Sequence, residues 1–302
     1  MTLRISMQCL KPLSIRNPKW LDGDAGAPRW LSVPCGKCEA CLSRRRQEWA
    51  FRLEREKLHS SSALFITLTY DEIHLPLSRD GLAHVSRRDC QCFLKRLRAR
   101  VNTELLKLGY SEELPNLRYY LSSEYGPTTY CPHYHLLLFN FPLKYLNAYE
   151  TILKSWNMGM VQVGPLRDGG AMYAAKYILH PFEDLPPTLT KPFSMMSRRP
   201  GIGFDSITEP LKKYCNDNKT YLVRIPGGRK IPLPRYFRTK IFDEETLREL
   251  SADVVAESEK TRVETFWDDI CRCGKSLEKD RKDAYRRQVR KSLEKNKLSS
   301  KL

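Results

Sequence analysis

The sequence lacks several features that would place it in a common class of protein. No apolar run approaches the roughly 20 residues of a membrane-spanning helix, and residues 1–17 contain no apolar export signal, so we expect a cytoplasmic protein with no membrane partner. The motif G-x-x-x-x-G-K-[ST] is absent, which excludes a P-loop helicase. Acidic residues are fewer than basic ones: the chain has 35 Asp and Glu and 52 Lys and Arg, which gives a net charge of +17. This excess predicts a polyanionic partner, and nucleic acid fits best.

Ten cysteines are present, and in a reducing cytoplasm their thiols are available to bind metal. Cys35, Cys38 and Cys41 form a C-x-x-C-x-x-C motif, in which Gly36 permits the tight turn that points the sulfurs at one centre. The pattern predicts a structural Zn²⁺ site with Cys9 as the nearest candidate for a fourth ligand. Free buried thiols and an iron–sulfur cluster are the alternatives. The rival fourth ligands are Cys90, Cys92 and Cys131.

Periodicity and turn signals predict an α+β fold. The expected helices span 43–60, 86–108, 145–159 (closed by Gly159) and 169–181, and the expected strands span 63–70, 117–126, 131–139 and 160–166. Their order is β-α-β-β-α-β followed by one more helix, which is the split βαβ pattern of ferredoxin-like domains. Such a domain has an antiparallel sheet with helices on one face, and the other face is open for a ligand.

The remaining segments are rich in basic residues. The stretch 180–204 is rich in Pro and Gly and is expected to be loop, 220–237 is expected to be a hairpin, and the chain from 243 onward is expected to be a charged helix that ends in a basic tail. Basic side chains on helix 43–60 and in the loop suit contact with phosphates. These candidate DNA-binding residues are Arg44, Arg45, Arg46, Arg198 and Arg199.

Two histidines begin the strand in CPHYHLLLF. His133 and His135 are two residues apart, so both side chains project from the same face of the strand. Glu124 ends the preceding strand, and the Gly-Pro turn after it brings the carboxylate back beside the two imidazoles. This donor set predicts an open site for Mg²⁺ or Mn²⁺. The alternative is a pair of half-exposed residues at a strand end.

The segment GAMYAAKYILHP carries two candidate nucleophiles. Tyr173 and Tyr177 are four residues apart on the expected helix, so their hydroxyls emerge from one face, with Lys176 to the side. A phenol with an ordinary pKa of about 10 needs help to ionise, and Lys176 and a bound cation can stabilise the phenolate. Packing in a core is the alternative reading. Two nucleophiles, a cation and a basic chain predict transesterification on DNA.

These motifs resemble a known family. FITLTY, SSEYG followed by PHYHLLLF, and YAAKY are similar in order and spacing to the three motifs of HUH endonucleases, the rolling-circle replication initiators. The double tyrosine and VPCGKCEACLSRRRQEWAFRLE resemble most the initiators of gokushovirus-type microviruses, which are small single-stranded DNA phages. The likeness spans roughly residues 9–240 and includes MSRRPGIG and GGRKIPLPRY. Tyr134 stands where the family usually has an aliphatic or bulky hydrophobe.

The resemblance implies a metal-dependent DNA nickase. His133, His135 and Glu124 would hold the cation, Tyr173 would form a 5′-phosphotyrosine and free a 3′-OH primer, and Tyr177 would act after one round of replication. Which tyrosine attacks first is open. The implied partners are a single-stranded or supercoiled origin and the helicase and DNA polymerase of a bacterial host, in whose cytoplasm the protein would act. The implied domains are a Cys-rich segment with a basic helix (1–60), an HUH endonuclease domain (61–240) and a charged, helical, basic tail (241–302).

Two other functions fit the same residues. One is a non-enzymatic, zinc-containing module that stacks single-stranded nucleic acid on Tyr119, Tyr120 and Tyr134. The other is an HUH transposase or relaxase, because the three motifs alone do not separate these uses from replication.

Overall fold

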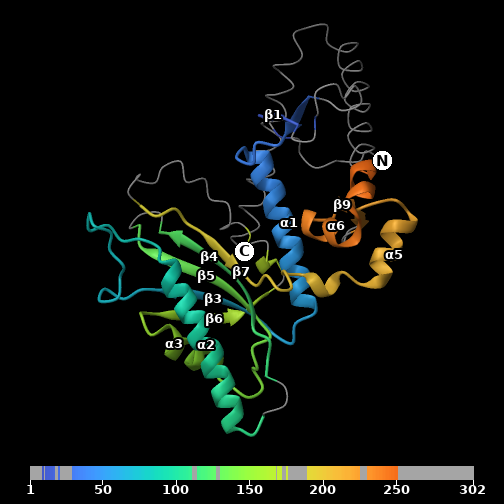
Figure 1. The fold of residues 1–302 in the computed structure, drawn as a ribbon. Helices are drawn as coiled ribbons and strands as arrows, with labels where there is room; N and C mark the ends of the chain where they lie inside the picture. Colours follow the sequence, from blue (N-terminus) through green and yellow to red (C-terminus); the bar gives the residue numbers. More distant parts are fainter. Residues whose placement is uncertain are drawn as a thin grey trace. The chain divides into compact units, whose positions relative to one another are not determined.

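The chain is organised as two compact units in the computed structural model (Figure 1). Trp49–Ile207 form one, which we call the sheet unit, and the described residues up to Glu48 and from Thr208 form the other, the cysteine unit. No helix in the described part of the chain is long and apolar enough to cross a membrane. The structure describes residues 9, 11–17, 20, 29–110, 114–126, 130–167, 169–171, 175, 189–224 and 230–250.

The cysteine unit contains two small antiparallel sheets and short helices. One sheet pairs β1 with β2, and the other pairs β8 with β9, as expected for the hairpin in 220–237. The turn of that hairpin and the basic tail from residue 251 lie outside the described residues. The elements are β1 (Leu13–Arg16), β2 (Trp30–Val33), α5 (Glu209–Asp217), β8 (Leu222–Arg224), β9 (Lys230–Pro232) and α6 (Arg235–Ile241).

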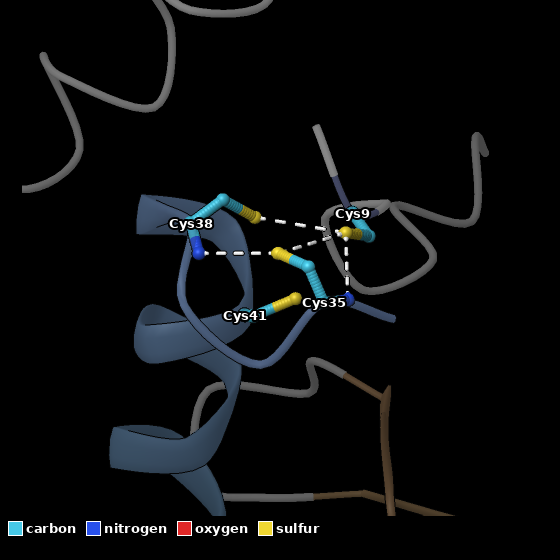
Figure 2. A group of neighbouring side chains, drawn as sticks. All are labelled: Cys9, Cys35, Cys38 and Cys41. Carbon is cyan, nitrogen blue, oxygen red and sulfur yellow. Dashed lines mark hydrogen bonds between the residues drawn. The ribbon is translucent and has the colours of Figure 1, made fainter. Parts of the chain in front are cut away.

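The first turn of α1 (Glu39–Leu58) lies in the cysteine motif, four residues before the expected start of this helix. Cys9, Cys35, Cys38 and Cys41 come together there, and their sulfur atoms all lie within 4.8 Å of one another (Figure 2). Cys90 is instead fully buried in the core of the sheet unit. The fourth member of the cysteine group is therefore Cys9.

A five-stranded antiparallel sheet forms the centre of the sheet unit, with the strand order β6-β3-β5-β4-β7. The expected α+β class and the element order β-α-β-β-α-β are confirmed. The Pro- and Gly-rich segment, expected to be loop, contributes the short edge strand β7, which pairs with β4. The elements are β3 (Ala63–Thr69), α2 (Arg87–Lys107), β4 (Arg118–Tyr125), β5 (Pro132–Phe139), α3 (Ala148–Trp156), β6 (Val161–Pro165) and β7 (Ser194–Met196).

One face of the sheet packs against α2 and α3, which lie side by side (Figure 1). Ser86 caps the N-terminus of α2 by accepting a hydrogen bond from the Asp89 N–H. The hydroxyl of Tyr134 is buried here, accepts a 2.7 Å hydrogen bond from the Ser86 N–H and lies 2.9 Å from the Tyr70 hydroxyl. Tyr134 therefore fills its apolar position and ties the start of α2 to the sheet.

The opposite face is not fully open, which corrects the sequence-based expectation. A second apolar cluster covers half of it, because Leu53 of α1 and Ile202 pack on Tyr120, Leu137 and other side chains of this face. The ring of Trp49, also on α1, lies 4.9 Å from the ring of Tyr120. The exposed half of this face is the part that carries the histidines.

The end of α3 differs from the expected one. Asn157, with a φ of 47°, forms the left-handed cap of the helix, so Gly159 does not close it. Gly159 has a φ of 145°, and a Cβ added there would lie 2.3 Å from the carbonyl oxygen of Thr69. A glycine is thus required where the chain passes the end of β3.

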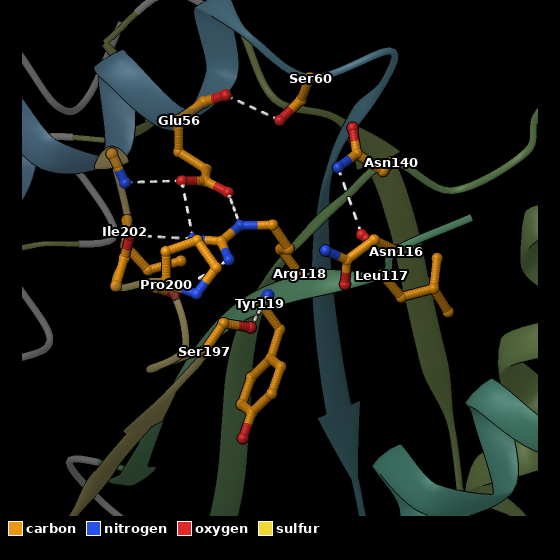
Figure 3. A network of polar contacts seen from close by, with 12 residues as sticks. Glu56, Ser60, Asn116, Leu117, Arg118, Tyr119, Asn140, Ser197, Pro200 and Ile202 are labelled. Carbon is orange, nitrogen blue, oxygen red and sulfur yellow. Dashed lines mark hydrogen bonds and ion pairs between the residues drawn. The ribbon is translucent and has the colours of Figure 1, made fainter. Parts of the chain in front are cut away.

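A buried ion pair joins α1, β4 and the segment around residue 201 (Figure 3). The guanidinium of Arg118 pairs with the Glu56 carboxylate and donates to the carbonyl oxygens of Pro200 and Gly201, both at 3.0 Å. Glu56 also accepts a 2.6 Å hydrogen bond from the Gly203 N–H. Because both side chains are at most 5% exposed, removing one partner leaves a buried charge without compensation.

We expect Arg118→Met to lower the free energy of unfolding by about 3–5 kcal/mol. The matched control is Lys154→Met, which breaks the exposed pair with Glu150, where both side chains are at least 60% exposed. This control is expected to cost less than about 1 kcal/mol. Urea denaturation of the full chain measures both values, and equal losses would contradict the structural role assigned to Arg118.

Candidate active site

Polar side chains occupy the half of the sheet face outside the apolar cluster, in rows that run across the strands; Ser122 among them is buried. The first row pairs Thr67 of β3 with His135 of β5, and His135 with Ser122 of β4. Gln162 and Ser194 extend this row to the two edge strands. The second row consists of Thr69, His133 and Glu124, in that order.

The carboxylate of Glu124 meets both imidazoles. Its Oε2 atom lies 3.3 Å from the Nε2 of His133 and 3.3 Å from the Nε2 of His135. The three side chains are 17%, 21% and 10% exposed, in the order Glu124, His133, His135, so solvent still reaches them. The hairpin of β4 and β5 produces this arrangement, because residue 124 is directly opposite residue 133.

The other ring nitrogen of each histidine, Nδ1, contacts a neighbouring polar group. The Nδ1 of His133 lies 3.2 Å from the carbonyl oxygen of Cys131, which can only accept, so this Nδ1 carries the proton. The Nδ1 of His135 lies 3.3 Å from the hydroxyl of Thr67. Such contacts orient the rings so that both Nε2 atoms point at the common centre.

The charges of Glu124 and His133 support each other. Burial by itself would raise the pKa of Glu124, but hydrogen bonds from the two histidines outweigh it and lower this pKa to about 2. Burial would lower the pKa of His133, yet the hydrogen bond to Glu124 raises it. The carboxylate is therefore ionised at neutral pH and available to a cation.

The donor set fits a divalent cation by its chemistry. Two imidazole nitrogens and one carboxylate oxygen lie within 4.8 Å of one another, on one face of a rigid sheet. Imidazole and carboxylate suit first-row divalent ions, and three protein ligands leave positions for water or a phosphate oxygen.

The segment that carries this site is similar to known replication-associated proteins. Residues 63–181 match the family model of the replication-associated protein ORF2. The expected resemblance to phage replication proteins is confirmed. The matched segment begins at β3 and includes Glu124, His133 and His135.

Three relatives are themselves replication-associated proteins of microvirus-type phages. ORF2 of Spiroplasma virus 4 is 26% identical over 264 residues, which cover 76% of this chain and 79% of the relative. VP4 of Bdellovibrio phage phiMH2K is 29% identical over 232 residues, which cover 69% of this chain and 67% of the relative. ORF4 of Chlamydia phage 1 is 26% identical over 253 residues, which cover 76% of this chain and 58% of the relative. No solved structure gives a significant match.

The predicted nucleophiles Tyr173 and Tyr177 and their neighbour Lys176 lie within the matched segment but outside the described residues. Described residues of the same expected helix are helical at 170, 171 and 175, and the side chains of Ala171 and Ala175 are fully buried. Ala171 belongs to the apolar cluster that includes Leu137. Ala171 therefore packs on the sheet face from which the histidines project.

The predicted phosphate-binding arginines differ in exposure. Arg45, Arg198 and Arg199 are exposed, whereas Arg44 and Arg46 are half-buried. Three polar groups of this region were not predicted as site residues. The carbonyl of Cys131 contacts His133, and Ser122 is directly opposite His135. Gln162 lies further along the same row, on the edge strand β6 opposite Thr67. Only the two-residue strand period indicated Ser122 and Gln162.

We expect Thr67→Val to weaken Mn²⁺ binding by about 10–100-fold, because it removes the hydroxyl that orients His135 without changing the size of the side chain. Thr67→Ser retains the hydroxyl and is the matched control. Electron paramagnetic resonance of bound Mn²⁺ gives the affinity without reference to activity. Equal affinities for the Val and Ser variants would show that Thr67 only fills space.

Proposed function

We propose that the chain initiates rolling-circle replication by nicking single-stranded DNA at an origin. The convergence of Glu124, His133 and His135 is the observation that carries this proposal. Relatives named as replication-associated proteins of phages support the biological role. The net charge of +17 supports DNA as the partner.

The fold supports the same chemistry. The four strands in the order β6-β3-β5-β4 are all antiparallel to their neighbours and are joined by α2 and α3. This arrangement fits the split βαβ topology of ferredoxin-like domains, and we infer an HUH endonuclease domain built on it.

The first step joins the enzyme to DNA. A divalent cation held by Glu124, His133 and His135 would supply Lewis-acid polarisation of the scissile phosphate. The phenolate oxygen of Tyr173 attacks phosphorus as the bond from phosphorus to O3′ breaks. The phenol proton is lost to solvent, and the leaving O3′ takes up a proton. The products are a 5′-phosphotyrosine and a free 3′-OH.

The second step closes the displaced strand. Tyr177 attacks the origin regenerated after one round, and the bond from phosphorus to O3′ breaks and frees a new 3′-OH. This 3′-OH attacks the phosphotyrosine formed first, the bond from phosphorus to the Tyr173 oxygen breaks, and Tyr173 leaves as a phenol that takes up the 3′-OH proton through solvent. The phosphodiester is thus restored without ATP. Lys176 stabilises the phenolates and the charge on the phosphate. Elongation from the first 3′-OH and unwinding fall to a host DNA polymerase and helicase, which places the reaction in the cytoplasm of a bacterium.

The structure does not favour the non-enzymatic binder. Two of the three aromatic residues proposed for stacking, Tyr120 and Tyr134, are at most 1% exposed, and their rings are covered by Trp49 and by Trp156 and Phe193. A stacking surface needs open ring faces. A transposase or relaxase shares the proposed chemistry, but the names of the relatives favour replication.

The test uses the full chain, origin-bearing single-stranded DNA and Mn²⁺. We expect a protein–DNA adduct that survives denaturation, and its loss in the double variant Tyr173→Phe with Tyr177→Phe. Tyr149→Phe changes an exposed tyrosine on α3 and is the matched control, which should form the adduct normally. A wild-type chain that forms no adduct, or a double variant that still forms it, would contradict the proposal.

The same assay tests the cation site. We expect His135→Ala to slow nicking by at least about 100-fold, because Lewis-acid stabilisation of the reacting phosphate is worth several kcal/mol. Filter binding of the same DNA should change little, since most of the affinity comes from contacts with phosphates. Normal nicking by His135→Ala would remove this histidine from the chemistry.

A further inference from the structure

The cysteine unit contains a second donor set, which the proposed DNA chemistry does not use. The sulfur atoms of Cys9, Cys35, Cys38 and Cys41 all lie within 4.8 Å of one another (Figure 2). We propose that these four side chains, as thiolates, bind one structural Zn²⁺ ion.

The spacing of the sulfur atoms fits a single tetrahedral ion. Zinc–sulfur bonds of about 2.3 Å at tetrahedral angles place neighbouring sulfurs about 3.8 Å apart. The Sγ of Cys9 lies 3.4 Å from that of Cys35 and 3.8 Å from that of Cys38. A four-iron cluster would hold its cysteine sulfurs further apart, because irons and sulfides lie between them. A disulfide would need a separation of about 2.0 Å.

The local backbone is arranged to stabilise thiolates. The N–H of Cys35 donates to the Sγ of Cys9 at 3.2 Å, and the N–H of Cys38 donates to the Sγ of Cys35 at 3.3 Å. Gly36, with a φ of 73°, makes the turn that directs these N–H groups inward. Cys38 directly precedes α1 and Cys41 lies in its first turn, so the start of this helix brings both sulfur atoms to the group.

The segment between Cys9 and Cys35 buries little apolar surface of its own. All four residues of β1 are exposed, and Leu13, Ile15 and Trp30 are 52%, 42% and 56% exposed. Within the described part of this segment, hydrophobic burial is therefore a weak source of order. A metal that joins Cys9 to residues 26 or more positions later supplies the missing constraint.

The donor set also indicates the role of the ion. Four thiolates fill the tetrahedral shell, so no position is open for water or a phosphate, and the site is structural and not catalytic. Soft thiolate ligands favour zinc over Mg²⁺ and Mn²⁺. The inference therefore stands apart from the proposed nicking reaction.

The experiment measures the metal content of the full chain, purified under reducing conditions, by elemental mass spectrometry. We expect about one zinc ion per chain, as for other closed four-ligand sites. Cys9→Ser and Cys38→Ser should contain almost none. Cys92→Ser alters an exposed thiol outside the group and should retain it. His135→Ala should also retain zinc while nicking is lost, which separates this inference from the proposed function.

Cobalt exchange gives a second measurement that does not depend on the folding of variants. The wild-type chain loaded with Co²⁺ should show sulfur-to-cobalt charge transfer and the visible bands of a tetrahedral ion. Absence of zinc, iron in its place, full zinc retention by Cys9→Ser, or an octahedral cobalt spectrum would each overturn the assignment. A disulfide among the four cysteines in the freshly reduced protein would do so as well.

Discussion

The pairing of Glu124 with His133 across β4 and β5 determines which side chains share the exposed half of the sheet face. Side chains alternate along a strand, so a slip of one residue would turn Glu124 toward α2 and α3. The opposite face opposes such a slip, because the Tyr134 hydroxyl is bonded to the Ser86 N–H in a buried core. Packing under the helices thus maintains the 3.3 Å contacts between Glu124 and both histidines on the other side.

A second constraint divides that face into an apolar half and a polar half. The buried pair of Glu56 and Arg118 holds the end of α1 beside β4, and Leu53, one turn earlier, packs on Leu137 in the same cluster. Going along β5 from Phe139 toward its start, the face changes from covered apolar residues to His135 and His133. At this end the pairing of the strands fixes the positions of the three donor side chains.

Periodicity was sufficient to predict the elements that position the site. In β3 buried residues alternate, in α2 they recur at helical spacing, and β5 ends in a short apolar run typical of a central strand, so local preference and tertiary packing agree. Two facts were enough to predict that Glu124, His133 and His135 lie together: side chains two residues apart share a face of a strand, and a turn joins β4 to β5. The start of α1 was missed because the cysteine motif contains no apolar period, although Cys38 and Cys41 lie at the start of the helix.

Three further features of the fold differ from the sequence-based prediction, each for a physical reason. Short strand β7 comes from a Pro- and Gly-rich segment and is specified by its partner β4, which no local pattern reveals. Asn157 supplies the left-handed cap assigned to Gly159, because asparagine also tolerates positive φ. The half-covered sheet face was missed because Leu53 and Ile202 are distant in sequence from the strands they contact.

The two donor groups differ in ligand type, which would separate the two proposed metal chemistries within one chain. Glu124, His133 and His135 offer one oxygen and two nitrogens on an open face, which leaves coordination positions for substrate. Cys9, Cys35, Cys38 and Cys41 offer four sulfurs and leave none. Mg²⁺ and Mn²⁺ compete poorly for thiolates, so the proposed zinc would persist at concentrations of these ions that load the open site. A mild chelator should therefore abolish nicking at a concentration that leaves the structural zinc in place. Mn²⁺ added afterwards should restore nicking, with no need to add zinc.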